Sequence, residues 1–189
     1  MKIRIGLITI MLIVAVNIAN AQCNCKFSSQ QYAGLLEGEK GSAFQLQTVN
    51  GLKFKTWFTG VGVGLDYYTY RSVPLFLSIN KEFLLGRNSI YALLDAGYNF
   101  PWYKREEGRG SNFISSDFSG GFYWSGGMGY KISVNKNRDA VLLNLGYSFK
   151  HMLESQEMPA FCVNPPCKSL VEKYDYKFNR LSLKLGYQF

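Results

Sequence analysis

The strongest constraint on the fold is the alternation of side chains over the last ten residues of the chain. Leu181, Leu183, Leu185, Tyr187 and Phe189 occupy every second position. The residues between them are polar or small, namely Arg180, Ser182, Lys184, Gly186 and Gln188. Because successive side chains of a β-strand point to opposite faces, this pattern predicts a strand with one apolar and one polar face.

The same period of two recurs along the chain, and beyond residue 40 apolar residues almost never follow the helical spacing i, i+3, i+4. We therefore predict an all-β protein with eight strands. Their expected ranges are Gln31–Gly38, Ala43–Phe54, Trp57–Asp66, Leu75–Asn80, Ile90–Phe100, Phe122–Ile132, Val141–Lys150 and Arg180–Phe189.

The polar faces indicate which side of the sheet is the interior. They carry glycines that suit a narrow, crowded inside: Gly60, Gly62, Gly64, Gly127 and Gly129. A soluble β-sandwich turns its charges outward to water, whereas a small membrane barrel turns its apolar face to lipid. Aromatic residues make up 16% of the chain although its mean hydropathy is only −0.08, which fits alternating strands. The predicted fold is an eight-stranded antiparallel up-and-down transmembrane β-barrel.

The N-terminus has the features of a cleaved secretory signal over residues 1–21. Lys2 and Arg4 precede an apolar stretch from Ile5 to Ile18, and Ala19-Asn20-Ala21 is an A-x-A cleavage site. A transmembrane anchor is the alternative, but the stretch is shorter than the roughly 20 residues that a spanning helix needs. We expect a short periplasmic segment over residues 22–30 and the barrel over residues 31–189. A lipoprotein start at Cys23 is disfavoured because Gln22 is not a small residue.

The links between the expected strands alternate in length. Short turns are expected at Lys55-Thr56, Leu85 to Ser89 and Asn135 to Asp139, and longer loops at residues 69–73, 101–117 and 152–175. In outer-membrane barrels short turns face the periplasm and long loops face outside. With an even number of strands, both termini are then expected on the periplasmic side.

With these features the chain resembles small eight-stranded barrels of the outer membrane protein A and X type, and a bacterial outer-membrane β-barrel domain family. The segments that carry the resemblance are Ala19-Asn20-Ala21, Gln47 to Gly51, Val61 to Tyr68, Asp95 to Tyr98 and Asn179 to Phe189. The resemblance implies a location in the bacterial outer membrane, in contact with lipid bilayer and lipopolysaccharide. It also implies that Leu181, Leu183, Leu185, Tyr187 and Phe189 form the signal that the barrel-assembly machinery reads.

Charged residues of both signs fall on the predicted inner face. They are Lys53, Asp66, Glu82, Asp95, Lys131, Arg180 and Lys184. Side chains just fill an eight-stranded barrel, and an unpaired buried ion costs several kcal/mol. We therefore expect an ion network that plugs the interior, with Arg180 close to at least one of Asp95, Glu82 and Asp66. A gated, narrow channel is the alternative.

The cysteines fall into two pairs. Cys162 and Cys167 lie in the longest expected loop, and we expect a disulfide between them because export permits it. Two cysteines without nearby histidines make a poor zinc site, so no metal is expected. The role of Cys23 and Cys25 stays open, and we expect no bridge between the two pairs.

His151 is the sole histidine of the chain, at the end of an expected strand and on its lipid-facing side. Ser148, Glu154 and Ser155 lie near it, so a lipid A-modifying acylhydrolase or acyltransferase is an alternative function. No His-x-Ser arrangement, nucleophile elbow or phosphate-binding glycine loop is present. We therefore expect a non-enzymatic barrel without a cofactor, which supports the envelope or binds an extracellular ligand through the loops 101–117 and 152–175.

The positive charge does not indicate a nucleic-acid partner. The whole chain has a formal charge of +8, and removal of Lys2 and Arg4 leaves +6. No basic patch interleaved with aromatic residues accompanies this excess, and an exported protein does not meet nucleic acid.

Overall fold

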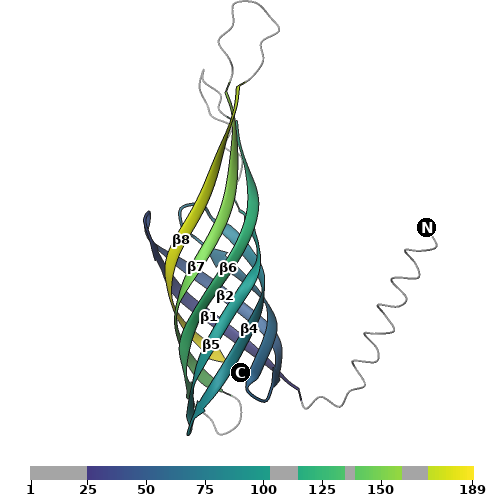
Figure 1. Cartoon of the computed structure of the whole chain (residues 1–189), viewed down its shortest axis with the longest axis vertical. Coiled ribbons are helices and arrows are strands. Elements are labelled where there is room, and N and C mark those ends of the chain that lie inside the picture. The colour runs from purple at the N-terminus through teal and green to yellow at the C-terminus, as the bar shows by residue number, and fades with distance from the viewer. Residues whose placement is uncertain (1–24, 103–114, 135–138, 159–169) are drawn as a thin grey trace, which may run out of the picture.

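The computed structural model describes residues 25–102, 115–134, 139–158 and 170–189, and within them it contains eight β-strands (Figure 1). The strands are β1 (Lys26–Gly38), β2 (Gly41–Phe54), β3 (Trp57–Asp66), β4 (Ser72–Leu85), β5 (Asn88–Pro101), β6 (Ser115–Ser133), β7 (Ala140–Met158) and β8 (Leu170–Gln188). No helix in these described ranges is long and apolar enough to cross a membrane.

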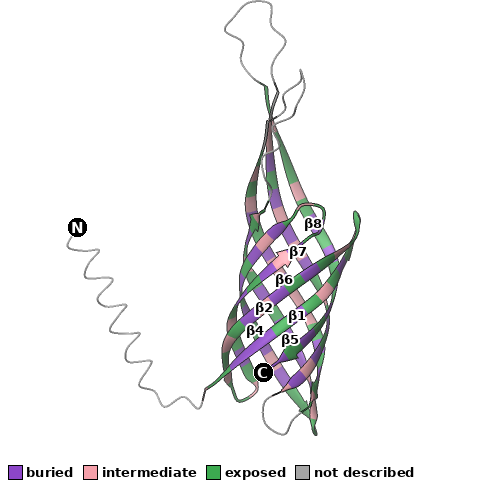
Figure 2. Cartoon of the chain, turned by 180° about the vertical axis from the view of Figure 1, so that it is seen from behind, coloured by how far each residue is buried: buried purple, intermediate pink, exposed green. Residues whose placement is uncertain are grey.

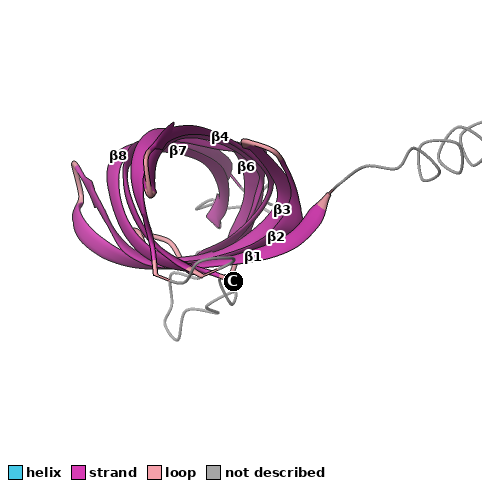
Figure 3. Cartoon of the chain, turned by 90° about the horizontal axis from the view of Figure 1, so that it is seen from below, coloured by secondary structure: helices cyan, strands magenta, loops and turns pink. Residues whose placement is uncertain are grey.

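Each strand pairs antiparallel with the next, and β8 pairs with β1 to close the sheet into a barrel. The closed ring is visible along the barrel axis in Figure 3. At the closing edge Ser29 N donates to Phe189 O over 2.9 Å, and Phe189 N donates to Ser29 O over 3.0 Å. The predicted eight-stranded antiparallel barrel is confirmed.

Exposed and buried residues alternate along the strands (Figure 2). In β8, Leu181, Leu183 and Leu185 are 59%, 50% and 59% exposed, whereas Arg180 and Lys184 are 1% and 3% exposed. The other strands follow the same rule, so the apolar face is outside and the polar face is inside. This arrangement is the inverse of a soluble protein and matches a barrel wall in contact with lipid.

All strands except β3 are longer than the sequence predicts, and the last three are the longest. β6, β7 and β8 have 19 residues each, whereas β1 to β5 have between 10 and 14. In Figure 1 they project together beyond the rest of the barrel, and we call this projecting part (residues 115–120, 152–158 and 170–179) the strand extension. The loop expected at 152–175 is therefore wrong at both ends, because residues 152–158 and 170–175 belong to β7 and β8. Likewise residues 115–117, expected in the loop 101–117, belong to β6.

The opposite end of the barrel carries the β2–β3 and β4–β5 turns, the start of β1 and the C-terminus, and we call it the turn end. A further two-residue turn, at residues 39–40 between β1 and β2, lies at the end of the barrel that carries the strand extension. Lys55 has a φ of 53° between β2 and β3, and Gly86 has a φ of 62° between β4 and β5, as tight hairpin turns require. The expected short turns at Lys55-Thr56 and Leu85 to Ser89 are therefore present. The third, at Asn135 to Asp139, lies mostly outside the described residues. β1 begins at Lys26, five residues before the expected Gln31.

Candidate functional site

All seven charged residues that the sequence predicts on the inner face lie inside the barrel. Together with their partners they form three groups along the barrel axis. The first group lies near the strand extension and is centred on Asp66, at the end of β3. Arg180 Nη1 donates to Asp66 Oδ2, and Lys150 Nζ lies 3.2 Å from Asp66 Oδ1. The three side chains are at most 4% exposed. Asp66 is thus the shared partner of two buried cations.

Lys150 was not among the predicted network residues, and the structure makes it one of the most connected. Its ammonium donates to Tyr68 O and Tyr70 O, each over 3.0 Å, and to Ser72 Oγ over 3.1 Å. The first two acceptors lie on the link between β3 and β4 and the third on the first residue of β4, so Lys150 anchors that link to β7. Lys150 stands on the polar side of its strand in the sequence pattern, which was the signal that could have identified it.

The second group is in the middle of the barrel. Lys184 Nζ lies 3.8 Å from Asp95 Oδ2 and donates to Gln47 Oε1 over 2.9 Å. Gln47 Nε2 in turn donates to the Tyr123 hydroxyl over 3.0 Å. The bonds connect β8, β5, β2 and β6 across the interior, so the group cross-links opposite walls.

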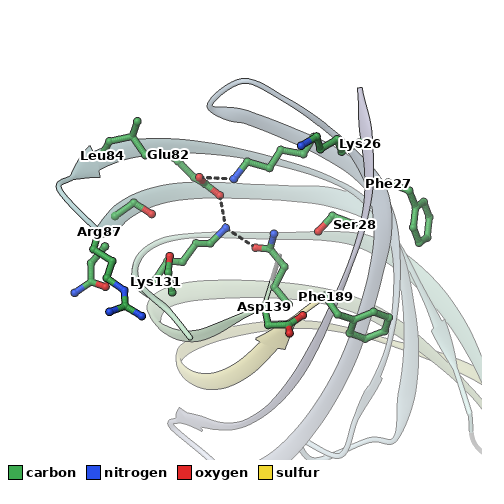
Figure 4. Close-up of a pocket in the computed structure, with 14 residues that line it drawn as sticks. Lys26, Phe27, Ser28, Glu82, Leu84, Arg87, Lys131, Asp139 and Phe189 are labelled. Carbon is green, nitrogen blue, oxygen red and sulfur yellow. Dashed lines mark hydrogen bonds and ion pairs between the residues drawn. The ribbon is translucent and has the colours of Figure 1, made fainter. Parts of the chain in front are cut away.

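The third group lies at the turn end, around Glu82 (Figure 4). Lys53 Nζ and Lys131 Nζ donate to its two carboxylate oxygens over 2.6 and 2.9 Å, and Lys131 also donates to Gln188 Oε1 over 2.9 Å. The group borders a cavity of about 800 Å³ that is also lined by Lys26, Arg87, Asp139 and Phe189. Lys53 is 26% exposed on its side chain, which marks this group as the most accessible of the three.

Aromatic and aliphatic side chains fill the remaining space inside the barrel. One cluster occupies the middle: Tyr32, Val49, Phe58, Phe76, Tyr91, Leu93, Tyr123 and Leu142. A second cluster, Leu36, Tyr68, Met152 and Phe178, lies beside the Asp66 group, with Tyr70, Phe118 and Tyr176 packed against it. The sequence pattern predicts a polar inner face and does not indicate that these rings fill it.

The central rings fit because glycines stand opposite them on the wall. A Cβ added to Gly62 would lie 2.3 Å from the Phe76 ring, and one added to Gly129 would lie 2.2 Å from the Tyr91 ring. These distances are far shorter than a van der Waals contact, so each ring occupies the volume that a side chain on the facing strand would need. Gly62 and Gly129 are thus sites where the wall accepts interior rings.

His151 is on the outer face, where its Nε2 lies 2.8 Å from Asp175 Oδ1. The Asp175 side chain is 52% exposed. Within the described ranges, no hydroxyl side chain is hydrogen-bonded to His151, and no group of three or more His, Cys, Asp and Glu residues is placed to hold a metal ion. The predicted Cys162–Cys167 pair lies outside the described residues, as does Cys23.

The predicted assembly row is on the outside of β8 and at the end of the chain. Leu181, Leu183, Leu185, Tyr187 and Phe189 are between 45% and 59% exposed. Phe189 lies at the turn end, where its backbone closes the sheet against Ser29.

Comparison with known proteins was informative at the level of structure. No family model matches the sequence, and no curated protein is similar enough to match it. A major outer membrane protein of Thermus thermophilus is 14% identical, with a TM-score of 0.51 over 88% of this chain and 100% of the other. Neisserial surface protein A is 14% identical, with a TM-score of 0.50 over 87% of this chain and 97% of that protein.

A third similar structure is that of the outer membrane protein AlkL, solved in lipid bilayers. It is 11% identical and has a TM-score of 0.50, and the match covers 90% of this chain and 92% of AlkL. At these identities the similarity concerns the fold and carries no information on ligands. The chain therefore has the fold of the small β-barrels of bacterial outer membranes.

Proposed function

We propose that this chain is a non-enzymatic integral protein of the bacterial outer membrane, whose barrel is closed inside and serves the envelope as a structural element or a surface for contacts. The observation that carries the proposal is the inversion of its two faces. The wall exposes leucine, valine and aromatic side chains, while Asp66, Asp95, Lys150, Arg180 and Lys184 are buried inside. Such a surface is stable only where lipid covers it.

The packing of the interior favours a plug over a channel. An eight-stranded barrel is just wide enough for its own side chains. The two apolar clusters and the Asp95 and Asp66 groups follow one another along the axis, and their charged groups are bonded to one another. An ion that entered from the cavity at the turn end would meet the central rings and would have to leave its water behind.

The strand extension supports a role in surface contacts. Strands β6 to β8 continue beyond the wall, and residues 103–114 and 159–169 join β5 to β6 and β7 to β8 in the sequence. We propose that this end faces outside and that both termini are periplasmic, because the β2–β3 and β4–β5 turns, the start of β1 and the C-terminus gather at the other end. Lipopolysaccharide would then surround the base of the extension, and the segments that join β5 to β6 and β7 to β8 would meet an extracellular ligand.

Conductance measurements on purified barrel in a planar lipid bilayer test the closed interior. We expect no unitary current steps from the unmodified protein. A variant with Phe76→Ala and Tyr123→Ala should conduct, because it removes two buried, contacting rings whose centroids are 5.5 Å apart. Regular current steps from the unmodified protein would favour the narrow channel instead.

The lipid A-modifying enzyme is the alternative that one observation favours, namely the pairing of His151 with Asp175 on the outer face. A histidine oriented by a carboxylate is the base of many hydrolases, but it needs a nucleophile within hydrogen-bond reach. We expect the acyl composition of lipopolysaccharide to stay unchanged after incubation with the same purified protein. A shortened or transferred acyl chain that disappears with His151→Ala would overturn the non-enzymatic proposal.

Replacement of the terminal aromatic residue tests the proposed assembly signal. Phe189→Ala should leave folding into lipid vesicles nearly unchanged, because the Phe189 side chain is 52% exposed and its backbone bonds to Ser29 remain. In cells it should lower the amount of folded barrel in the outer membrane several-fold. The measurement is the fraction of heat-modifiable protein in isolated membranes. Leu143→Ala, an outward residue of β7 that is 48% exposed, is the control.

A further inference from the structure

The outer wall of β1 and β2 carries four polar side chains that are bonded to one another, and we call them the polar seam: Ser29, Gln31, Thr48 and Asn50. Ser29 Oγ donates to Asn50 Oδ1 over 2.7 Å. Gln31 Nε2 donates to Thr48 Oγ1 over 2.8 Å and to Ser29 Oγ over 3.2 Å. The rest of the outer wall between the aromatic girdles is dominated by leucine, isoleucine, valine and methionine.

Within the polar seam, Gln31 and Thr48 lie in the middle of the membrane-facing band, and Ser29 lies nearer the turn end, beside Phe189. Thr48 is at the midpoint of β2 (Gly41–Phe54), and Gln31 is one residue from the midpoint of β1 (Lys26–Gly38). At a similar depth, the neighbouring strands β8 and β3 carry Leu185 and Val63, which are 59% and 40% exposed. A polar group at this depth meets no water, so hydrogen bonds to protein are its only strong partners.

The seam is not fully satisfied by its own bonds. Within the described part of the chain, the side-chain carbonyl of Gln31 and the amino group of Asn50 have no hydrogen-bond partner, and both side chains are exposed. One of these groups is an acceptor and the other is a donor. The surface therefore offers a complementary pair of bonds that lipid hydrocarbon cannot make.

The tilt of the strands places these two residues suitably for a symmetric contact. If the paired residues are followed from Ser29 once around the barrel, the path returns to β1 about ten residues beyond Ser29. Divided over eight strands, this displacement shifts each strand by a little over one residue relative to its neighbour. Gln31 and Asn50 consequently lie at nearly the same depth in the membrane. A two-fold axis along the membrane normal, passing between them, would bring each Asn50 opposite the Gln31 of the other copy.

We propose that the polar seam is the contact surface between two copies of this chain in the membrane. Asn50 Nδ2 of each copy donates to the Gln31 carbonyl of the other, which gives a reciprocal pair of bonds. A hollow of about 690 Å³ lies beside the seam, over Ala33, Thr48 and Val63. It is bordered by Leu46, Leu65, Leu185 and Tyr187, and projecting side chains of the second copy can pack into it. A lipid chain could fill this hollow, but it would leave both amide groups unpaired.

The inference rests on the proposed membrane location, and subunit counting by single-molecule photobleaching in lipid bilayers tests it. The fluorescently labelled full mature chain should bleach in two steps. The double variant Gln31→Leu with Asn50→Leu should bleach in one step, with a dissociation constant raised at least tenfold. The matched control is Leu94→Ala with Leu145→Ala, two outward residues of β5 and β7, which should remain dimeric.

Heat-modifiable migration of each variant shows that its barrel has folded, and membrane fractionation shows that it has inserted. An unmodified chain that is inserted and folded but bleaches in one step at every protein density would overturn the dimer and leave the membrane proposal intact. A double leucine variant as dimeric as the unmodified chain would overturn the role of the seam. A chain that does not insert would count against the membrane proposal itself.

Discussion

Asp66→Ala is expected to lower the free energy of unfolding of the barrel by about 3–5 kcal/mol, the cost typical of removing one partner from a buried ion pair. The substitution leaves the Arg180 guanidinium and the Lys150 ammonium without a counter-charge, and both side chains are fully buried. It also removes the carboxylate that accepts from Tyr68 N over 2.8 Å at the start of the β3–β4 link. Urea unfolding of the protein in lipid vesicles measures the loss.

Asp175→Ala is the matched control for this prediction. It breaks an ion pair of similar length, since Asp175 Oδ1 lies 2.8 Å from His151 Nε2, but the pair is on the outer face and Asp175 is about half exposed. Exposed pairs contribute about 0–1 kcal/mol, so the free energy of unfolding should barely change. Equal losses in the two variants would mean that the interior is hydrated and that the Asp66 group does not act as a buried network.

Gly129→Val should lower the free energy of unfolding by about 2–3 kcal/mol, because it overpacks the middle of the barrel. An added Cβ would lie 2.2 Å from the Tyr91 ring, which is 2% exposed and belongs to the central cluster of buried side chains. Combining it with Tyr91→Ala should recover part of the loss, so that the double variant is more stable than the sum of the two single effects predicts. The measurement is the same urea unfolding in vesicles.

Gly126→Val, on the same strand, is the control for overpacking. A Cβ at Gly126 would have its nearest neighbour at 3.6 Å, an ordinary contact with the Trp124 ring. Valine also suits a strand better than glycine does, so the stability should stay within about 0.5 kcal/mol or rise. A loss as large as that of Gly129→Val would show that backbone effects, and not the Tyr91 ring, explain the cost at position 129.

The period of two was sufficient to predict the fold and the orientation of its faces. In β8 every residue from Arg180 to Phe189 faces the side that the sequence predicts, and the same holds for the alternating cores of β3 to β7. The pattern is reliable there because lipid on one side and a crowded interior on the other both select for side-chain type. Where a strand no longer has lipid on one side, the alternation of apolar and polar residues no longer predicts it.

The strand extension was missed for this reason. Beyond His151 the outer face of β7 and β8 carries residues such as Ser155, Asp175 and Lys177, so apolar residues no longer alternate with polar ones. The strands nevertheless continue, because backbone pairing between β7 and β8 persists to Met158 and Leu170. Backbone hydrogen bonds do not require particular side chains, so a strand whose outer face meets water cannot be recognised from alternating apolar residues.

The partners inside the barrel could not be derived from the pattern either. The sequence places Asp66, Asp95 and Arg180 on the inner face, but the choice of partner depends on strand register and on the stagger of the closed sheet. Asp66 and Arg180 are 114 positions apart and meet because β3 and β8 bring them to the same level across the interior. The contact between Gly129 and the Tyr91 ring could not be predicted for the same reason, because it depends on the register between β5 and β6.

The closing contact between β1 and β8 has a consequence for the order of folding. Gln30 and Gln188, which face each other there, are 158 positions apart, whereas every other strand pair joins neighbours along the chain. Local hairpins can form while the polypeptide is still being delivered, but β1 must wait with an unpaired edge until the final residues arrive. Contacts of such high sequence separation form slowly, and an open edge invites association with other chains. The edge of β1 is therefore open to association with other chains from the synthesis of β1 until Phe189 arrives.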